Sequence, residues 1–273
     1  MNGNLELVYA KNNTKTQLIH SLGKAPLKIQ RPFYPAGEKI CHSVVLHTAG
    51  GMVGGDTLRE NIHLQKNAQV LITTAAAQKI YRSNGETAKQ TIDIKIDEGA
   101  NLEWLPTETI VFNGAIYQQK LRVELAPGGS WLGWEITRFG RTARGERFLA
   151  GEWRSHTEVW QQGKPLWIDP QWLPAGENMI NSPHGLAGKA IVGSMIFIGK
   201  PVSQEIIDKA RSIWDELPPK GEIGVTQTLG EGLLCRYRGA STAEVRNWFI
   251  AVWQLLRLSV FQYEIIKPRI WQI

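Results

Sequence analysis

The feature that most constrains the fold of this chain is a strand–turn–strand unit that recurs three times. The copies span residues 62–71, 94–104 and 123–134, and each places alternating apolar residues on both sides of a turn. Measured at Ala68, Ala100 and Gly129, successive copies lie 32 and 29 residues apart. This period is typical of stacked coils that bury their apolar faces against one another. The repeat predicts a β-helix-like core, with an antiparallel meander or sandwich as the alternative.

The rest of the chain up to about residue 200 also favours strands. Between residues 5 and 200, apolar and polar residues alternate and are interrupted by Gly, Pro and Asn. Two segments of the C-terminal third have helical spacing instead. One extends over 203–217, from Ser203 as N-cap to a stop at Pro218-Pro219, and the other over 241–263, opened by the capping-box spacing of Ser241 and Glu244. We therefore expect a mainly β fold, a β-helix-like stack of short strands with two α-helices in the C-terminal third.

Length and composition indicate one folded domain over residues 1–273. Hydrophobic residues make up 42% and charged residues 21%, ordinary values for a globular protein, and no long linker divides the chain. No apolar run approaches the roughly 18 residues of a membrane helix, and the first residues lack the pattern of a signal peptide. We expect a cytoplasmic protein without a membrane partner, with Cys41 and Cys235 as thiols. The eleven Trp residues fit either a core or a docking surface.

Charge argues against nucleic acid as a partner. The net charge of +6 is dispersed along the chain. Its densest basic cluster, Arg138, Arg141, Arg144 and Arg147, is interrupted by glycines and Glu146. Nucleic-acid binders concentrate such residues on one face or in runs. The cluster indicates a solvated edge or a site for an acidic protein partner.

The sequence lacks the patterns of several enzyme classes. A glycine string at Gly50, Gly51, Gly54 and Gly55 does not have the order of a dinucleotide-binding loop, and no nucleophile-elbow or P-loop motif is present. The string indicates backbone that needs positive φ or close approach. The histidines form no zinc-type spacing, so no closed metal cage is predicted.

A transient metal site would use loosely arranged oxygen ligands. Candidate carboxylates lie in or beside the apolar strands: Asp56, Glu103, Glu108 and Glu135. The alternative for each is a surface ladder or a buried, hydrogen-bonded pair. The residue types alone leave both interpretations open.

Several unusual strings together resemble the urease accessory protein UreD family, called UreH in some organisms. They extend over 47–56, 73–83, 102–112 and 114–115, and agree with the family in order and spacing. Further matches occur at Gly133-Trp134-Glu135, at Gly140-Arg141 and Gly145-Glu146, at 185–188 and at 268–271. The resemblance covers the chain from about residue 5 to its last residues.

The resemblance implies a maturation factor, not an enzyme. Such a protein would bind the urease apoprotein, recruit the accessory protein UreF and, through it, the GTPase UreG, and support GTP-dependent insertion of nickel into urease. It would hold no tight cofactor and would handle nickel(II) only as transient cargo. The family fold implied is a β-helix-like stack with two helices.

The resemblance also implies an internal passage for nickel. We expect its lining among His47, Asp56, Glu103, Glu108 and Glu135, because an unpaired carboxylate amid apolar neighbours needs water, a partner or a cation. Alanine at Asp56 or Glu135 should then lower urease activation without disrupting assembly.

Two other classes compete with this interpretation. A Trp-rich β protein could be a carbohydrate-binding module, although the missing secretion pattern counts against it. A metal-dependent β-barrel enzyme would require clustered histidines, which the sequence lacks.

Overall fold

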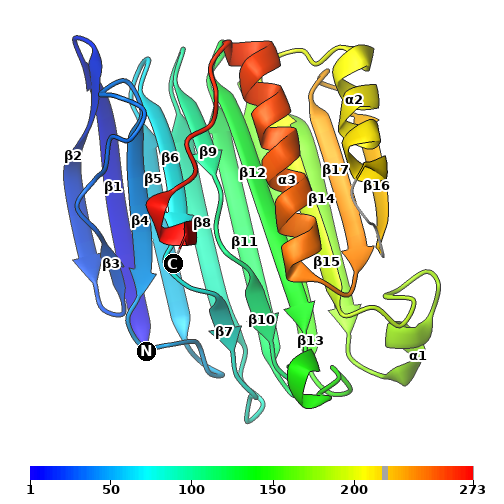
Figure 1. Cartoon of the computed structure of the whole chain (residues 1–273). Helices are drawn as coiled ribbons and strands as arrows, with labels where there is room; N and C mark the ends of the chain where they lie inside the picture. The colour runs from blue at the N-terminus through cyan, green and yellow to red at the C-terminus, as the bar shows by residue number, and fades with distance from the viewer. Residues whose placement is uncertain (217–220, 273) are drawn as a thin grey trace.

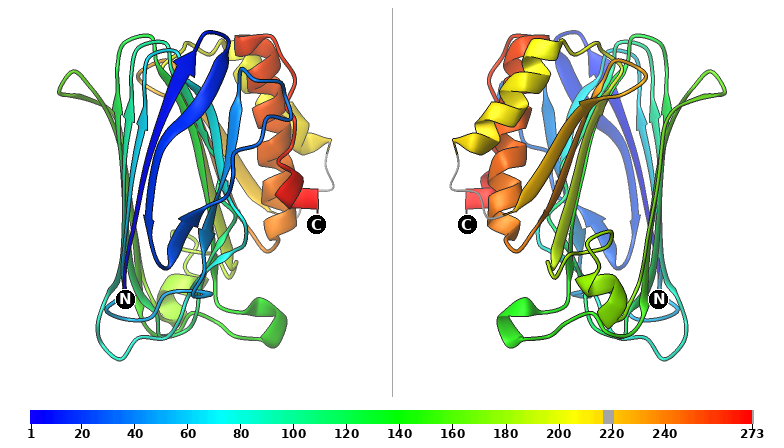
Figure 2. Two further views of the ribbon diagram at one scale, coloured as in Figure 1. Left: turned by 90° about the vertical axis from the view of Figure 1, so that its left-hand side faces the viewer. Right: turned by 90° about the vertical axis from the view of Figure 1, so that its right-hand side faces the viewer.

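The computed structural model describes residues 1–216 and 221–272, and it consists of two stacked β-sheets with helices on one outer face (Figures 1 and 2). The first sheet has seven strands in the order β14-β13-β11-β8-β5-β1-β2. Their bounds are β1 Asn2–Asn12, β2 Lys15–Lys24, β5 Thr57–Leu64, β8 Ala88–Ile96, β11 Ile116–Leu125, β13 Glu152–Gln161 and β14 Lys164–Pro174.

The second sheet has ten strands. Its main order is β16-β17-β15-β12-β9-β6-β4-β3, and β10 and β7 continue it beside β12. The bounds are β3 Leu27–Ile29, β4 Cys41–His47, β6 Gln69–Thr74, β7 Gln78–Ile80, β9 Asn101–Trp104, β10 Thr109–Val111, β12 Ser130–Phe139, β15 Ile191–Ile198, β16 Glu222–Gln227 and β17 Leu233–Gly239.

About four solenoid-like coils form the centre of the molecule. Each coil sends one strand through the second sheet and the next through the first: β4 to β5, β6 to β8, β9 to β11, and β12 to β13. Neighbouring coils pair in parallel in both sheets. The three sequence repeats are the corners at which β5 leads to β6, β8 to β9 and β11 to β12. The β-helix-like prediction is confirmed, and antiparallel strands close both ends of the stack.

Equivalent positions of successive coils stack in register and fill the space between the sheets. In the first sheet Ile62 pairs with Ile94, Ile94 with Val123, and Val123 with Val159, and all four side chains are buried. Side chains alternate between the two faces of a strand, so every second residue of each strand faces inward throughout. A residue added within a strand would turn the apolar set outward, so the three-residue difference between the two repeats lies in the segments that connect β6 to β8 and β9 to β11.

Helices cover the outer face of the second sheet (Figure 2). Helix α2 (Gln204–Asp215) and helix α3 (Thr242–Leu256) confirm the two predicted helices, and a π-helical turn, η2 (Arg257–Phe261), continues α3. Ser241 caps α3 by accepting a hydrogen bond from the Glu244 N–H. Ser203 precedes α2 without such a bond, and the predicted stop at Pro218-Pro219 lies outside the described residues. A short helix α1 (Glu177–Asn181) and single 3-10 turns, η1 (Thr142–Arg144) and η3 (Arg269–Gln272), complete the chain.

Tryptophans hold the helices against the sheet. Trp134 of β12 packs on Phe249 and Trp253 of α3 and on Trp271 near the C-terminus. The Trp248 indole N–H donates to the Ala210 carbonyl and thereby joins α3 to α2. Seven tryptophans are buried, namely Trp104, Trp131, Trp134, Trp153, Trp214, Trp248 and Trp253. Most of the tryptophan content therefore serves the core.

A buried ion pair lies under α3. The Glu103 carboxylate accepts hydrogen bonds from Arg257 Nε at 2.7 Å and from the Trp253 indole N–H at 2.8 Å, and Arg257 Nη2 also binds it. Both charged side chains are almost fully buried. Removing one partner would leave the other charge without compensation inside the protein.

We predict that Arg257→Met lowers the free energy of unfolding by about 3–5 kcal/mol, because Glu103 would remain buried and unpaired. Arg154→Met, which removes an exposed pair with Glu152, is the control and should cost about 1 kcal/mol or less. Urea unfolding monitored by tryptophan fluorescence measures both. Equal losses in the two variants would contradict a special role for the buried pair.

Candidate functional site

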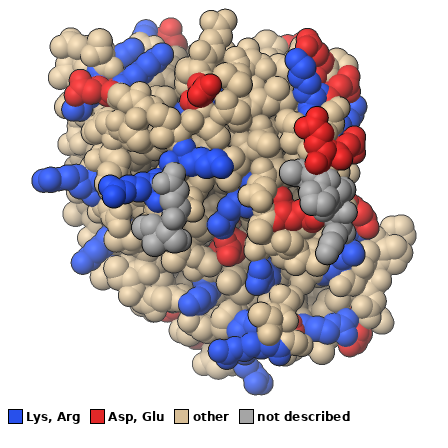
Figure 3. Space-filling model, viewed as in Figure 1, with Lys and Arg blue, Asp and Glu red and all other residues tan. Residues whose placement is uncertain are grey.

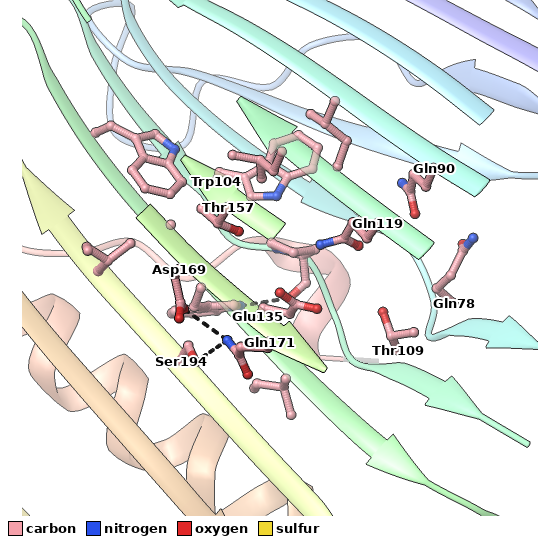
Figure 4. Close-up of a pocket in the computed structure, with 18 of the residues that line it drawn as sticks. Gln78, Gln90, Trp104, Thr109, Gln119, Glu135, Thr157, Asp169, Gln171 and Ser194 are labelled. Carbon is pink, nitrogen blue, oxygen red and sulfur yellow. Dashed lines mark hydrogen bonds between the residues drawn. The ribbon is translucent and has the colours of Figure 1, made fainter. Parts of the chain in front are cut away.

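A polar cavity lies between the two sheets, inside the coil stack. Its volume is about 80 Å³, room for several water molecules. Tryptophans and aliphatic side chains form much of its wall, among them Trp104, Trp131 and Trp167. Polar side chains of both sheets also point into it, and Figure 4 shows Gln90, Gln119, Glu135 and Asp169 following one another across it.

One row of inward positions supplies three polar residues of the cavity lining, Gln90, Gln119 and Gln171, and the buried Ser155 lies in the same row. Gln90 of β8 is in register with Gln119 of β11, Gln119 with Ser155 of β13, and Ser155 with Gln171 of β14. These residues lie at the same alternate positions of their strands as buried apolar residues, and they therefore face inward as those do. The result is a line of hydrogen-bonding groups that crosses four strands, along the axis of the stack.

Hydrogen bonds connect the row with a carboxylate near each end. At one end Gln90 donates to Glu60 Oε1 at 2.8 Å, and the Tyr117 hydroxyl donates to Gln90 Oε1 at 2.7 Å. At the other, the Ser155 hydroxyl donates to Glu135 Oε2 at 2.8 Å. Glu60 Oε2 is buried and has no hydrogen-bond partner among the described residues. The cavity thus contains carboxylate oxygens with free acceptor capacity.

An ion pair lies beyond Glu135, where β14, β15 and β17 meet. Arg236 contacts Asp169 at 2.7 Å, and the Gln171 amide donates to Asp169 at 3.0 Å and to the Ser194 hydroxyl at 3.3 Å. Asp169, Gln171 and Ser194 all line the cavity. This cluster ties the edge strand of the first sheet to the second sheet.

Burial raises the pKa of both cavity glutamates. Loss of hydration raises the pKa of Glu60 to about 7, and the Gln90 hydrogen bond opposes the shift. Loss of hydration also raises the pKa of Glu135 to about 7, opposed mainly by the Ser155 hydrogen bond. Near neutral pH each carboxyl can therefore exchange a proton for a cation.

The predicted passage residues occupy different settings. Glu135 lines the cavity. Glu103 faces the opposite side of the second sheet, where Arg257 neutralises it, and Glu108 pairs with Arg246 of α3. Asp56 accepts hydrogen bonds from the α-amino group of Met1 and from the Val53 N–H.

His47 is the fifth predicted lining residue. It ends β4, and burial lowers its pKa, while the Asp56 carboxylate opposes that shift. Neither His47 nor Asp56 is among the residues that line the cavity. No group of three or more His, Cys, Asp or Glu side chains in 1–216 and 221–272 is arranged to hold a metal ion.

The glycine motif shapes the corner between β4 and β5. Gly51 has φ of +150°, and a Cβ there would lie 2.6 Å from the Lys79 carbonyl oxygen. A Cβ at Gly54 would lie 2.7 Å from the Glu86 carbonyl oxygen. Gly50 and Gly55 also have positive φ. The string is therefore needed where two backbones approach closely.

The Arg141 and Glu146 motif closes the loop after β12. Arg141 Nε and Nη2 donate to the two Glu146 oxygens at 3.0 and 2.8 Å, and Gly145 adopts a left-handed conformation at the end of η1. The Arg141 guanidinium also covers the Phe112 ring at 4.7 Å. These residues are on the surface, away from the cavity.

Comparison with known proteins identifies the family. The model of the UreD urease accessory protein family matches residues 1–272. The chain belongs to the UreD family. Proteins named urease accessory protein UreD from Trichormus variabilis and Nostoc punctiforme are 67% and 65% identical to it, over 99% of this chain and 95% and 96% of theirs. The UreD of a Synechocystis species is 41% identical over 93% of this chain and 94% of its own length.

Membership of this family implies a role in urease maturation and interaction with urease and other accessory proteins. The family name describes an accessory role, not a catalytic one, and it replaces the carbohydrate-binding and β-barrel enzyme alternatives. Among residues 1–216 and 221–272, no helix is long and apolar enough to cross a membrane.

Several cavity residues were missed from sequence: Glu60, Gln90, Gln119, Asp169 and Gln171. A usable signal existed for three of them. Ile92, Ile94 and Ile96 mark the inward parity of β8, and Gln90 shares it; Leu121 and Val123 mark the parity that Gln119 shares. Glu60 shares the parity of Ile62. A polar residue among the alternate positions that otherwise carry apolar side chains indicates a polar row in the interior.

We predict a pH-dependent stability gain from Glu60→Gln and Glu135→Gln. From pH 4.5 to about 7 the folded chain retains protons that the unfolded chain releases, so these carboxyls lower the free energy of unfolding as pH rises. Each variant should gain stability relative to the unaltered chain, on the order of 2 kcal/mol more at pH 7.5 than at pH 4.5.

Urea unfolding at a series of pH values measures this difference. Glu98→Gln, at an exposed carboxyl paired with Lys66, controls for the general effect of the substitution. A stability difference between Glu60→Gln and the unaltered chain that stays constant over this pH range would contradict the assignment.

Proposed function

We propose that this chain is a urease maturation factor that binds the urease apoprotein and recruits UreF and, through it, UreG, for GTP-dependent nickel insertion. We further propose that nickel(II) passes through the cavity between the sheets as transient cargo. The observation that supports the passage is the row Gln90, Gln119, Ser155 and Gln171, with Glu60 and Glu135 beside it.

The chemistry of the row suits brief contact with a divalent cation. A doubly charged ion needs compensation in a low-dielectric interior, and two carboxyls with pKa values of about 7 supply it by releasing protons. Carboxylate, amide and hydroxyl oxygens bind nickel less tightly than imidazole or thiolate clusters do. Ligands spread over four strands therefore favour movement of the ion over its capture.

The geometry revises which residues should carry the cargo. Glu135 keeps the role expected from the sequence, and Glu60 joins it from the first sheet, whereas Asp169 lines the cavity but is paired with Arg236. Glu103 and Glu108 already have arginine partners, which compete with a cation for their oxygens. Asp56 and His47 lie outside the cavity lining, so a contribution from them would have to be indirect.

The first experiment is a co-purification. The tagged chain is expressed with urease subunits, UreF and UreG from one source, and complex formation and nickel-dependent urease activity are both measured, with and without this chain. We expect capture of urease and UreF and activity that depends on the chain. No capture and full activity in its absence would overturn the maturation role.

We predict that Glu135→Gln lowers urease activation at least about tenfold while complex formation is unchanged, since it removes one anionic oxygen ligand from the passage. Glu98→Gln, outside the cavity, is the matched control and should activate normally. Loss of the complex in Glu135→Gln would assign the residue a structural role. Normal activation with an intact complex would overturn the passage but leave the maturation role standing.

A further inference from the structure

A second feature, on the outer surface, is unrelated to the passage. A groove lies where β7, β10 and the end of β12 form a small parallel sheet beside the η1 loop. Its lining is Lys79, Tyr81, Ile110, Phe112, Arg138, Arg141, Ala143 and Arg144. No acidic side chain is among these lining residues. Figure 3 shows basic side chains gathered on this lower part of the face.

Three of the four cations in the groove have no carboxylate partner among residues 1–216 and 221–272. Arg141 is neutralised by Glu146. Lys79, Arg138 and Arg144 form no ion pair within the described part of the chain, where most other arginines are paired. Arg138 Nη2 donates to the Thr242 hydroxyl at 2.9 Å, and its buried Nε has no hydrogen-bond partner there. The groove therefore holds uncompensated positive charge, and the Thr242 hydroxyl holds the Arg138 side chain in place.

The strand register sets the spacing of the backbone positions that carry two of these charges. Lys79 of β7 is opposite Ile110 of β10, and Ile110 is opposite Arg138 of β12. Two strand spacings place the Cα atoms of Lys79 and Arg138 about 10 Å apart, with an apolar side chain between them. A peptide in the polyproline II conformation has three residues per turn and rises about 3.1 Å per residue, so side chains three residues apart lie on one face, about 9 Å apart. Two carboxylates three residues apart on such a segment would match the row.

The aromatic residues favour a peptide over a nucleic acid. Tyr81 and Phe112 pack edge to face at 5.0 Å, and Arg141 covers Phe112. Arg141 thus occupies one face of Phe112, and the contact between the two rings occupies a further face, whereas nucleic-acid sites offer free aromatic faces on which bases stack. The half-buried edges still offer apolar contact to a side chain. A short groove with three free cations is also small for a phosphate backbone.

We propose that this groove docks an acidic segment of a partner protein, with glutamate or aspartate side chains three residues apart on Lys79 and Arg138, and Arg144 contacting a further carboxylate. The proposal does not depend on the nickel passage. Lys79, Ile110 and Arg138 face outward, while their neighbours Gln78 and Thr109 line the cavity on the other side of the same strands.

Fluorescence anisotropy with synthetic peptides tests the proposal on the full chain. The probe is a labelled peptide with glutamates three residues apart and proline and leucine between them, which favours the polyproline II conformation, and its counterpart carries glutamine in place of glutamate. We expect the glutamate peptide to bind in a salt-dependent manner and the glutamine peptide to bind at least about tenfold more weakly.

Matched variants locate the binding. Lys79→Glu with Arg144→Glu should weaken binding of the glutamate peptide at least about tenfold, and a lysine version of the peptide should bind this variant better than it binds the unaltered chain. Lys89→Glu with Lys120→Glu makes the same change of net charge on exposed residues of the first sheet and should bind normally. Circular dichroism checks that both variants are folded.

Three results would overturn the proposal. One is equal weakening by the two charge-reversed variants, which would reduce the effect to net charge. Another is equal binding of the glutamate and glutamine peptides. The third is tighter binding of a DNA 20-mer with the same dependence on Lys79 and Arg144, which would assign the groove to nucleic acid.

Discussion

In-register stacking of one coil on the next is the constraint on which the rest of this structure depends. Parallel pairing in both sheets fixes each strand against its neighbours by backbone hydrogen bonds, and the side chains at equivalent positions then form continuous rows. A row of Ile and Val residues becomes core, and a row of Gln and Ser residues becomes a polar line through the interior. The same register thus builds both the stable centre and the candidate passage.

Charge inside the protein is handled in two ways. Glu103 is compensated permanently by Arg257 and Trp253, so it contributes to docking of α3. Glu60 and Glu135 accept hydrogen bonds from neutral donors only, and loss of hydration raises the pKa of both to about 7. A carboxyl of the first kind holds structure together. A carboxyl of the second kind can take up and release a proton near neutral pH, which is what the proposed passage requires.

Much of the fold could be predicted from sequence because its determinants are local. The repeat at 32 and 29 residues, the strand alternation and the helical stripes depend on residues close in the chain, and each was confirmed. The cavity was only partly predictable. Glu135 was identified, but Glu103 and Glu108 looked equivalent to it, since their arginine partners are 154 and 138 residues away.

The sequence by itself determined the coil period, the alternation of inward and outward residues along strands of the first sheet, the helix positions and the family. Only the tertiary structure decided which of the two sets of alternate side chains on a strand faces the other sheet and which faces the helices. Glu103 and Glu135 illustrate the reason. Alternation separates the two faces of a strand, but the layer that covers each face comes from distant segments, and this layer determines whether a carboxylate pairs with Arg257 or lines the cavity.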